Sequence, residues 1–163
     1  MVVAELTREQ VLDWLRDVPD PEIPVVTIDD LGIVRDVELG DEVVVSLAPT
    51  YSGCPATEAI ENSVLETLRR QGVDKVRIRR VLSPPWTTDW ISDEGREKLR
   101  RYGIAPPEKN AGKRSLMDAL RVVSCPRCES TQTSLVSEFG STACKASYKC
   151  DACLEPFEYF KCI

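Results

Sequence analysis

The hydrophobic positions near the start of the chain repeat at helical spacing. Residues 7–18 predict a helix because their apolar side chains fall on one face. These apolar residues are Val11, Leu12, Trp14, Leu15 and Val18. Thr7 and Gln10 form a capping-box pattern at the helix start, and the prolines in residues 20–24 end the helical pattern.

The pattern then changes to the alternation that is typical of strands. Residues 33–38 and 42–48 predict two strands around Gly40 and Asp41, a pair that signals a hairpin. Apolar residues return to helical spacing over 55–71, and residues 73–82 alternate as a third strand. A last helix is expected to begin at Ser92 or Asp93 and to end near Tyr102.

These elements define a first domain over residues 1–103, with the order α-β-β-α-β-α. Helices packed on a short mixed sheet place the domain in the α/β or α+β class. Residues 104–119 are rich in proline, then polar and basic, and predict a linker. Residues 120–163 then form a second, β-rich domain.

The composition narrows the possible chemistry. The 163 residues carry a net charge of −6 and contain no histidine. A Ser-His-Asp triad and a Cys-His pair are therefore excluded, and so is a di-iron centre of the Glu-x-x-His type. The charge does not favour nucleic acid, and no apolar run approaches the about 18 residues of a membrane span. The N-terminus lacks the features of a signal peptide, so we expect a cytoplasmic protein.

The second domain contains two C-x-x-C pairs, which predict a metal site. The four cysteines are Cys125, Cys128, Cys150 and Cys153. Two such turns can place four thiolates around one ion. Strands are expected at 121–124, 134–139 and 146–149, as in a zinc ribbon, and the metal would supply much of the folding free energy. Disulfides, a rubredoxin-like iron and an iron–sulfur cluster are the alternatives.

Two further cysteines, Cys144 and Cys162, accompany the ribbon. Each is either a small buried side chain or part of an additional thiol site, with Cys144 the stronger candidate.

Cys54 stands far from the other cysteines, directly before Pro55 at a predicted helix start. The helix dipole and the free N–H groups there favour a thiolate. Thr50 and Ser52 could donate hydrogen bonds to a bound anion or sulfur. A thiol without a neighbouring base suits a metal or sulfide ligand better than a hydrolytic nucleophile; the alternative is a buried cysteine.

Two other segments are unusual. Acidic residues gather in the loop that contains Asp20, Glu22, Asp29 and Asp30, which is either functional or a capped turn. Trp86 and Trp90 follow two prolines, and these tryptophans either bind a partner or cover the core.

Three stretches together resemble a known family: DPEIPVVTIDDLGIVRDV, SLAPTYSGCPA and LSPPW. They are similar to the iron–sulfur assembly factors that include the eukaryotic cytosolic targeting factor and the bacterial SufT-like proteins. With the WTTDWIS stretch and the cysteine-rich tail, nearly the whole chain outside the linker resembles the accessory subunits of phenylacetyl-CoA epoxidase systems, which act in aerobic phenylacetate degradation.

The resemblance implies a site that contains Asp20, Glu22, Thr50 and Cys54. It implies a non-catalytic accessory protein that helps to mature the iron–sulfur or di-iron centres of the epoxidase. The alternative is a structural subunit or scaffold of that complex. Expected cofactors are a structural zinc and a transient iron–sulfur cluster. Expected partners are other epoxidase subunits, the reductase and the iron–sulfur assembly machinery; small relatives pair, so a homodimer is also an expectation.

Overall fold

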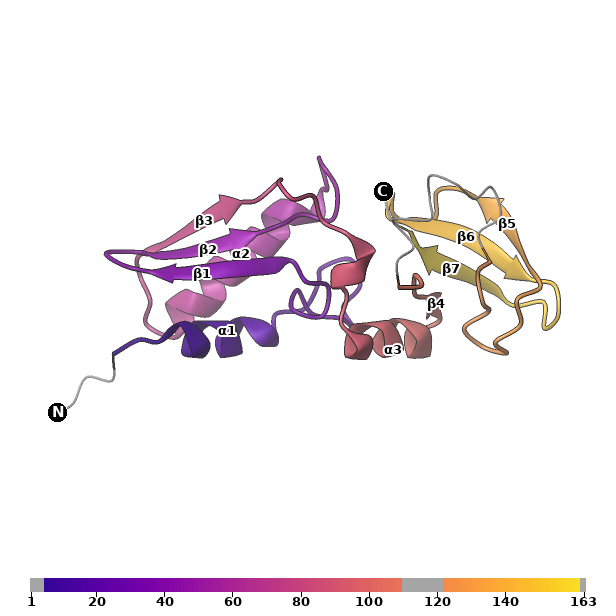
Figure 1. Cartoon of the computed structure of the whole chain (residues 1–163), viewed down its shortest axis with the longest axis horizontal. Helices are drawn as coiled ribbons and strands as arrows, with labels where there is room; N and C mark the ends of the chain where they lie inside the picture. Colours follow the sequence, from indigo (N-terminus) through magenta and orange to yellow (C-terminus); the bar gives the residue numbers. More distant parts are fainter. Residues whose placement is uncertain (1–4, 110–121, 162–163) are drawn as a thin grey trace. The chain divides into compact units, whose positions relative to one another are not determined.

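The computed structural model of the chain describes residues 5–109 and 122–161 and divides into two compact units, Met1–Trp86 and Thr87–Ile163. The first unit contains α1 (Arg8–Arg16), β1 (Val34–Leu39), β2 (Val43–Leu47), α2 (Ala56–Arg70) and β3 (Val76–Arg80) (Figure 1). The second contains the 3₁₀ helix η1 (Thr88–Trp90), α3 (Asp93–Tyr102), β4 (Ile104–Ala105), β5 (Thr133–Ser137), β6 (Lys145–Cys150) and β7 (Pro156–Phe160). The order from α1 to α3 agrees with the predicted order.

Local signals set the helix ends as predicted. At the start of α1, the Gln10 backbone N–H donates to Thr7 Oγ1 at 3.2 Å, and the Thr7 N–H donates to Gln10 Oε1 at 2.9 Å, which completes the capping box. Ser92 Oγ caps α3 by accepting the Gly95 N–H at 2.9 Å. Gly103 ends α3 with a φ of 94°, a left-handed conformation that glycine adopts readily.

The sheet of the first unit has the order β1-β2-β3, with β1 antiparallel and β3 parallel to β2. Val37, Val45 and Ile78 are register partners and therefore lie on one face of the sheet. Arg80 shares this face and pairs with Glu61 of α2, so α2 covers this side. The buried residues of α2 complete the core with this face: Ala56, Ile60, Val64 and Leu68.

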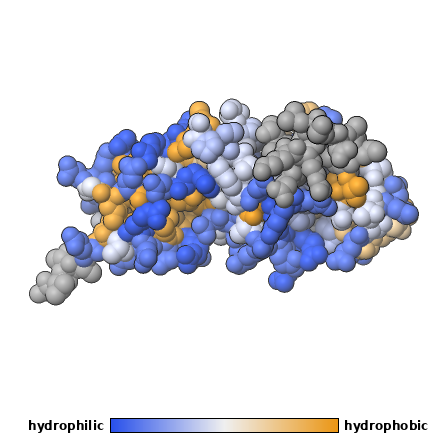
Figure 2. All heavy atoms as spheres, viewed as in Figure 1, coloured by the Kyte–Doolittle hydropathy of each residue, from blue (hydrophilic) through white to orange (hydrophobic). Residues whose placement is uncertain are grey.

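Charged side chains cover the opposite face of this sheet. Val44 and Ser46 point to that face but are only 6% and 1% exposed. Arg79 of β3 pairs with Glu38 of β1 across the central strand, and its Nε donates to Ser46 Oγ at 3.0 Å. Figure 2 shows hydrophilic residues over this unit with hydrophobic residues between them. Long arginine and glutamate stems thus bury the central strand on this face.

The sheet of the second unit has the order β4-β7-β6-β5 and corrects three predictions. Ile104 and Ala105, expected in the linker, form β4 and pair with β7. Residues 122–124, expected in a strand, have no strand conformation, whereas β7 was not predicted. β4 and its partner β7 are distant in sequence, so local patterns do not reveal that pairing. β7 also pairs with β6, the strand before it in the chain. Residues 106–109 of the predicted linker have no helix or strand conformation, and the rest of it, 110–119, lies outside the described residues, as does residue 121.

The domain boundary also differs from the predicted one at residue 103. The division into compact units places α3 with the β-rich part of the chain, since α3 contacts β4. Among the helices of the described residues, none is long and apolar enough to cross a membrane.

Candidate functional site

The topology of the first unit brings three of the predicted site segments to one end of its sheet. The carboxyl ends of β2 and β3 lie at the same edge because these strands are parallel, and the start of β1 pairs with the end of β2. The loop before β1, the loop from β2 to α2 and the loop after β3 therefore meet at this edge. Ala48 N–H donates to Ile33 O, and Val81 N–H donates to Leu47 O, both at 2.8 Å.

Cys54 lies in the loop between β2 and α2, two residues before the first residue of α2. Its side chain is buried, with 9% of the residue exposed, and Thr50 Oγ1 donates to its Sγ at 3.9 Å. Gly53 has a φ of 78°, which turns the chain so that Cys54 precedes the helix. The Cys54 N–H donates to Tyr51 O at 3.2 Å, and the Cys54 carbonyl accepts the Thr57 N–H at 3.1 Å. The structure thus places Thr50 and Cys54 together at the helix start.

The acidic loop before β1 is built around two buried carboxylates. Asp20 Oδ1 accepts the backbone N–H groups of Glu22 and Ile23 at 2.9 and 2.8 Å. Asp30 Oδ2 accepts the Thr27 N–H, and Thr27 Oγ1 accepts the Asp30 N–H, both at 3.0 Å. These bonds are those of capped turns, which was one of the two interpretations of this loop. Asp20 therefore sets the loop conformation, while Glu22 is half-buried.

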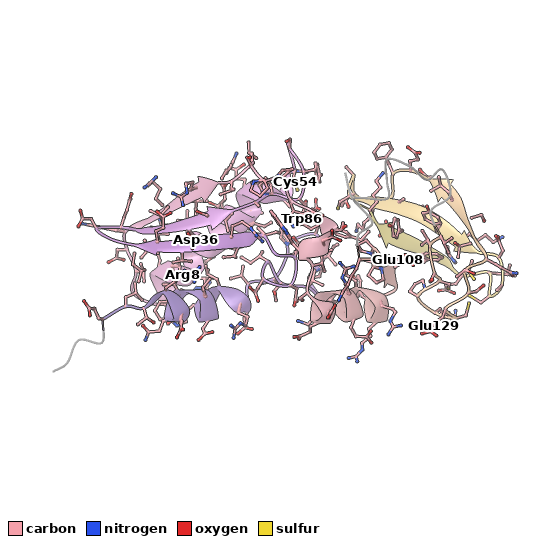
Figure 3. All side chains as sticks on the ribbon, viewed as in Figure 1. Arg8, Asp36, Cys54, Trp86, Glu108 and Glu129 are labelled. Atoms are coloured by element: carbon pink, nitrogen blue, oxygen red, sulfur yellow. The ribbon has the colours of Figure 1, made fainter. Side chains whose placement is uncertain are left out.

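Trp86 lies in the core of the first unit instead of on a displayed loop. It is 7% exposed, and its Nε1 donates to the Leu31 carbonyl at 2.8 Å. This position corrects the prediction that Trp86 presents a partner-binding surface, because a buried indole has little area left for a partner. Figure 3 shows Cys54 and Trp86 at the same end of the sheet. Trp90 belongs to η1 in the second unit and is half-buried.

The four ribbon cysteines come together as predicted. All four sulfurs lie within 4.8 Å of one another. Cys125 and Cys150 are buried, whereas Cys128 and Cys153 are more exposed. Both turns use the same backbone bond: the Cys125 N–H donates to Ser130 O, and the Cys150 N–H donates to Glu155 O, each at 2.9 Å. The turns are thus two copies of one knuckle.

The sulfur separations fit a tetrahedral metal ion. Cys125 Sγ lies 3.7 Å from Cys153 Sγ, and Cys128 Sγ lies 3.5 Å from Cys150 Sγ. An ion with metal–sulfur bonds of about 2.3 Å separates its ligands by about 3.8 Å in a tetrahedron. The four knuckle cysteines form no disulfide, so these separations are contacts between thiols. The cluster is a metal-binding site with four sulfur ligands.

The thiols of this cluster differ in acidity. The backbone N–H of Cys153, helped by that of Ala152, lowers the pKa of Cys150 to about 7. The backbone N–H of Glu155 lowers the pKa of Cys153, but burial and the neighbouring cysteine sulfurs outweigh it and raise that pKa to about 12. Hydrogen bonds to the neighbouring sulfurs hold the Cys153 proton and favour the thiol form. A divalent cation can take the place of such a proton between the sulfurs, so the cluster suits a metal.

Cys144 is separate from this cluster. It is buried, and its Sγ forms a hydrogen bond of 3.0 Å with Thr142 Oγ1. The group of metal-ligating residues in the described chain contains the four knuckle cysteines and not Cys144. This burial fits a small buried side chain, one of the two interpretations. An additional thiol site of Cys144 with Cys162 stays a prediction, since Cys162 lies outside the described residues.

Two features of the ribbon escaped the sequence analysis. Lys145 is 4% exposed, and its Nζ lies 3.3 Å from Oε2 of the half-buried Glu158, which forms an ion pair between β6 and β7. The residues that follow the second cysteine of each knuckle, Glu129 and Leu154, have positive φ angles of 62° and 65°. Glycine usually marks such a conformation in a sequence. Because neither position is a glycine, the sequence did not predict these two left-handed residues.

Comparisons with known proteins agree with this two-part organisation. Residues 8–79 match the model of the iron–sulfur cluster assembly protein family, and residues 109–161 match the PaaD zinc β-ribbon domain. A protein from Escherichia coli described as a putative subunit of 1,2-phenylacetyl-CoA epoxidase is 52% identical over 91% of this chain and 89% of its own length. An Fe-S protein maturation auxiliary factor from Porphyromonas gingivalis is 35% identical over 57% of this chain and 90% of its own length.

Two solved structures share the fold of the first part of the chain. A domain of unknown function, DUF59, from Bacillus anthracis covers 56% of this chain and 90% of its own length, with a TM-score of 0.53 and 28% identity. A conserved hypothetical protein from Thermotoga maritima covers 58% and 95%, with a TM-score of 0.50 and 33% identity. The extent of the match to the E. coli relative, together with the ribbon match, shows that the chain belongs to the PaaD family.

Proposed function

We propose that this chain is a non-catalytic accessory protein of a phenylacetyl-CoA epoxidase system that assists the maturation of iron–sulfur or di-iron centres in the oxygenase or the reductase. The similarity to the E. coli epoxidase protein and to the P. gingivalis maturation factor supports this assignment. Its partners are then the other epoxidase subunits and the iron–sulfur assembly machinery, in the cytoplasm and without nucleic acid.

The observation that carries the proposal is the position of Cys54 at the loop edge of the first unit. Cys54 lies two residues before the first residue of α2, and the Thr50 hydroxyl donates to its Sγ. A thiolate there can bind iron or a cluster transiently, as the cargo of the protein. The thiol proton is released when the iron–sulfur bond forms. No histidine is present to act as a general base, which suits ligand exchange better than acyl transfer.

The loops around Cys54 hold the site in shape. Asp20 fixes the acidic loop through the backbone of Glu22 and Ile23, and Trp86 ties the loop after β3 to Leu31. In this proposal Asp20, Glu22 and Thr50 position the loops next to the reactive sulfur. The second unit holds a structural zinc through Cys125, Cys128, Cys150 and Cys153, because four sulfur ligands leave no open coordination position.

The test replaces Cys54 by alanine in cells that express the epoxidase system. We expect the purified oxygenase or reductase to contain less iron than when the wild-type chain is present, while this chain accumulates normally. Cys144→Ala is the matched control, because it removes a buried thiol outside the proposed site. Wild-type iron content with Cys54→Ala would contradict the maturation role. Co-purification at fixed stoichiometry with that same wild-type content would favour the alternative, a structural component of the complex.

A further inference from the structure

Helix α3 and strand β4 bury too few residues to fold by themselves. α3 is ten residues long, and its buried residues are Gly95 and Leu99, while β4 has two residues. Isolated helices shorter than about 12–15 residues are marginal in water, so packing against another element must stabilise α3. The iron–sulfur assembly match ends at residue 79 and the ribbon match begins at residue 109, so neither match indicates what this segment packs against.

The core around the metal ligands supplies the packing that β4 needs. Ala105 is 2% exposed and belongs to the buried cluster that also contains Cys125 and Cys150. It is the register partner of Tyr159 on β7, another member of this cluster. Two of the four metal ligands are thus part of the same small core as β4. If the sulfurs separate, β4 loses the core on which it packs.

An ion pair joins α3 to the first knuckle. Arg100 Nη1 lies 3.2 Å from Glu129 Oε1, and Glu129 directly follows the metal ligand Cys128. The Glu129 N–H donates to the Cys125 carbonyl at 2.9 Å, so the closed turn sets the position of this glutamate. The pair is exposed and contributes little free energy by itself. It does place α3 beside the knuckle, whose closure brings the sulfurs together.

Arg96 extends the connection to the start of the second unit. Its Nη2 donates to the Thr88 carbonyl of η1 at 2.7 Å, and its Nη1 donates to the Pro107 carbonyl after β4. Both acceptors are backbone groups, so these bonds require that η1, α3 and the chain after β4 are folded together. Loss of the packing of β4 would therefore disrupt η1 and α3 as well.

We infer that metal binding at Cys125, Cys128, Cys150 and Cys153 controls the folding of residues 87–107 as well as that of the ribbon. With the metal bound, η1, α3 and β4 are ordered with the ribbon, and without it they unfold together with the ribbon. The first unit contains none of these cysteines and has its own core between α2 and its sheet, so it stays folded in both states. The four-sulfur site is then a metal-dependent switch for α3.

Amide hydrogen exchange of the full-length chain, with zinc and after its removal by a chelator, tests this inference. A ligand that binds only the folded state, at a free concentration of 100 times its Kd, lowers the unfolded population about 100-fold. The amides of α3 should therefore exchange up to about 100-fold faster once zinc is removed. The amides of α1 and α2 in the same sample should keep their rates, and they serve as the internal control.

Cys128→Ser separates the loss of zinc from other effects of the chelator. Cys128 is an exposed ligand and is not part of the buried cluster, so the substitution weakens the metal site with little direct effect on packing. Protection of α3 should then require a higher zinc concentration and should return as the site fills. Cys144→Ala is the matched control, since it removes a buried thiol of the same unit outside the four-sulfur site. It should keep the zinc dependence of the wild type.

Three results would overturn the inference. The first is that α3 keeps its protection in the zinc-free chain, because α3 would then fold without the metal site. The second is that α1 and α2 lose protection as much as α3 does, because the chain would then unfold as one body. The third is that α3 protection in Cys128→Ser does not follow zinc occupancy. Because exchange is measured on this chain alone, the result does not depend on the proposed function.

Discussion

The hydrogen bond between Trp86 and Leu31 connects two of the three loops at the edge of the first sheet, and its loss should be measurable. Trp86→Phe keeps an aromatic ring in the core but removes the Nε1–H that donates to the Leu31 carbonyl at 2.8 Å. Leu31 is 1% exposed, so water cannot easily replace the lost donor. A buried acceptor left without its partner costs about 1–3 kcal/mol.

This cost predicts a lower melting temperature for the first unit. In a domain of this size each kcal/mol lowers Tm by about 4–8 °C, so a loss of about 2 kcal/mol lowers it by roughly 8–16 °C. Far-UV circular dichroism of the full-length chain measures the transition. Amide hydrogen exchange shows which part of the chain is destabilised. The amides of the acidic loop before β1 should exchange faster in the variant, whereas those of the ribbon should not change.

Trp90→Phe is the control for this experiment, because Trp90 lies in the second unit. It should leave exchange in the acidic loop at the wild-type rate. The reasoning would be refuted if Trp86→Phe changed Tm by less than about 2 °C and left that loop as protected as before, because the hydrogen bond would then contribute little to the edge.

Two further predictions concern the ribbon. The metal affinity of the apo protein should fall as pH falls through about 7. The pKa of the Cys150 thiol is lowered to about 7, so below that pH the thiol is protonated and protons compete with the metal. Competition with a chelator between about pH 6 and 8 measures the affinity, and an affinity that does not change with pH would contradict the prediction. Gly140→Ala should destabilise the ribbon, because the added Cβ would lie 2.6 Å from Glu158 Oε1 and displace the partner of buried Lys145. Gly40→Ala is the control, since its Cβ would meet only a backbone oxygen at 3.9 Å. Urea unfolding compares the two variants, and an equal loss of stability in both would exclude the displacement of Glu158 as the cause.

Short-range patterns predicted the helices of this protein well. Thr7 acts with Gln10, Ser92 acts with Gly95, and Gly103 acts on the last turn of α3. Each interaction spans only a few residues, so the caps of α1 and α3 follow from the sequence alone. The spacing of the knuckle cysteines was informative for the same reason, because a C-x-x-C turn brings two sulfurs to one ion without help from distant residues.

Long-range pairing produced the differences. β4 is two residues long and exists because it pairs with β7, more than fifty residues later. The placement of Trp86 also depends on a distant partner, since its hydrogen-bond acceptor is in the loop before β1. A tryptophan after two prolines has the same local pattern on a surface as in a core, so sequence alone could not separate the two interpretations.

The sequence by itself thus determined the element order of the first part, the four-sulfur metal site and the family resemblance, because each depends on residues close together in the chain or on motif identity. Only the tertiary structure decided that the acidic loop, the Cys54 loop and the Trp86 loop share one edge, since this depends on the parallel pairing of β2 and β3. It also decided that Leu154 is an exposed side chain on a left-handed turn, because the closure of the knuckle sets that backbone angle.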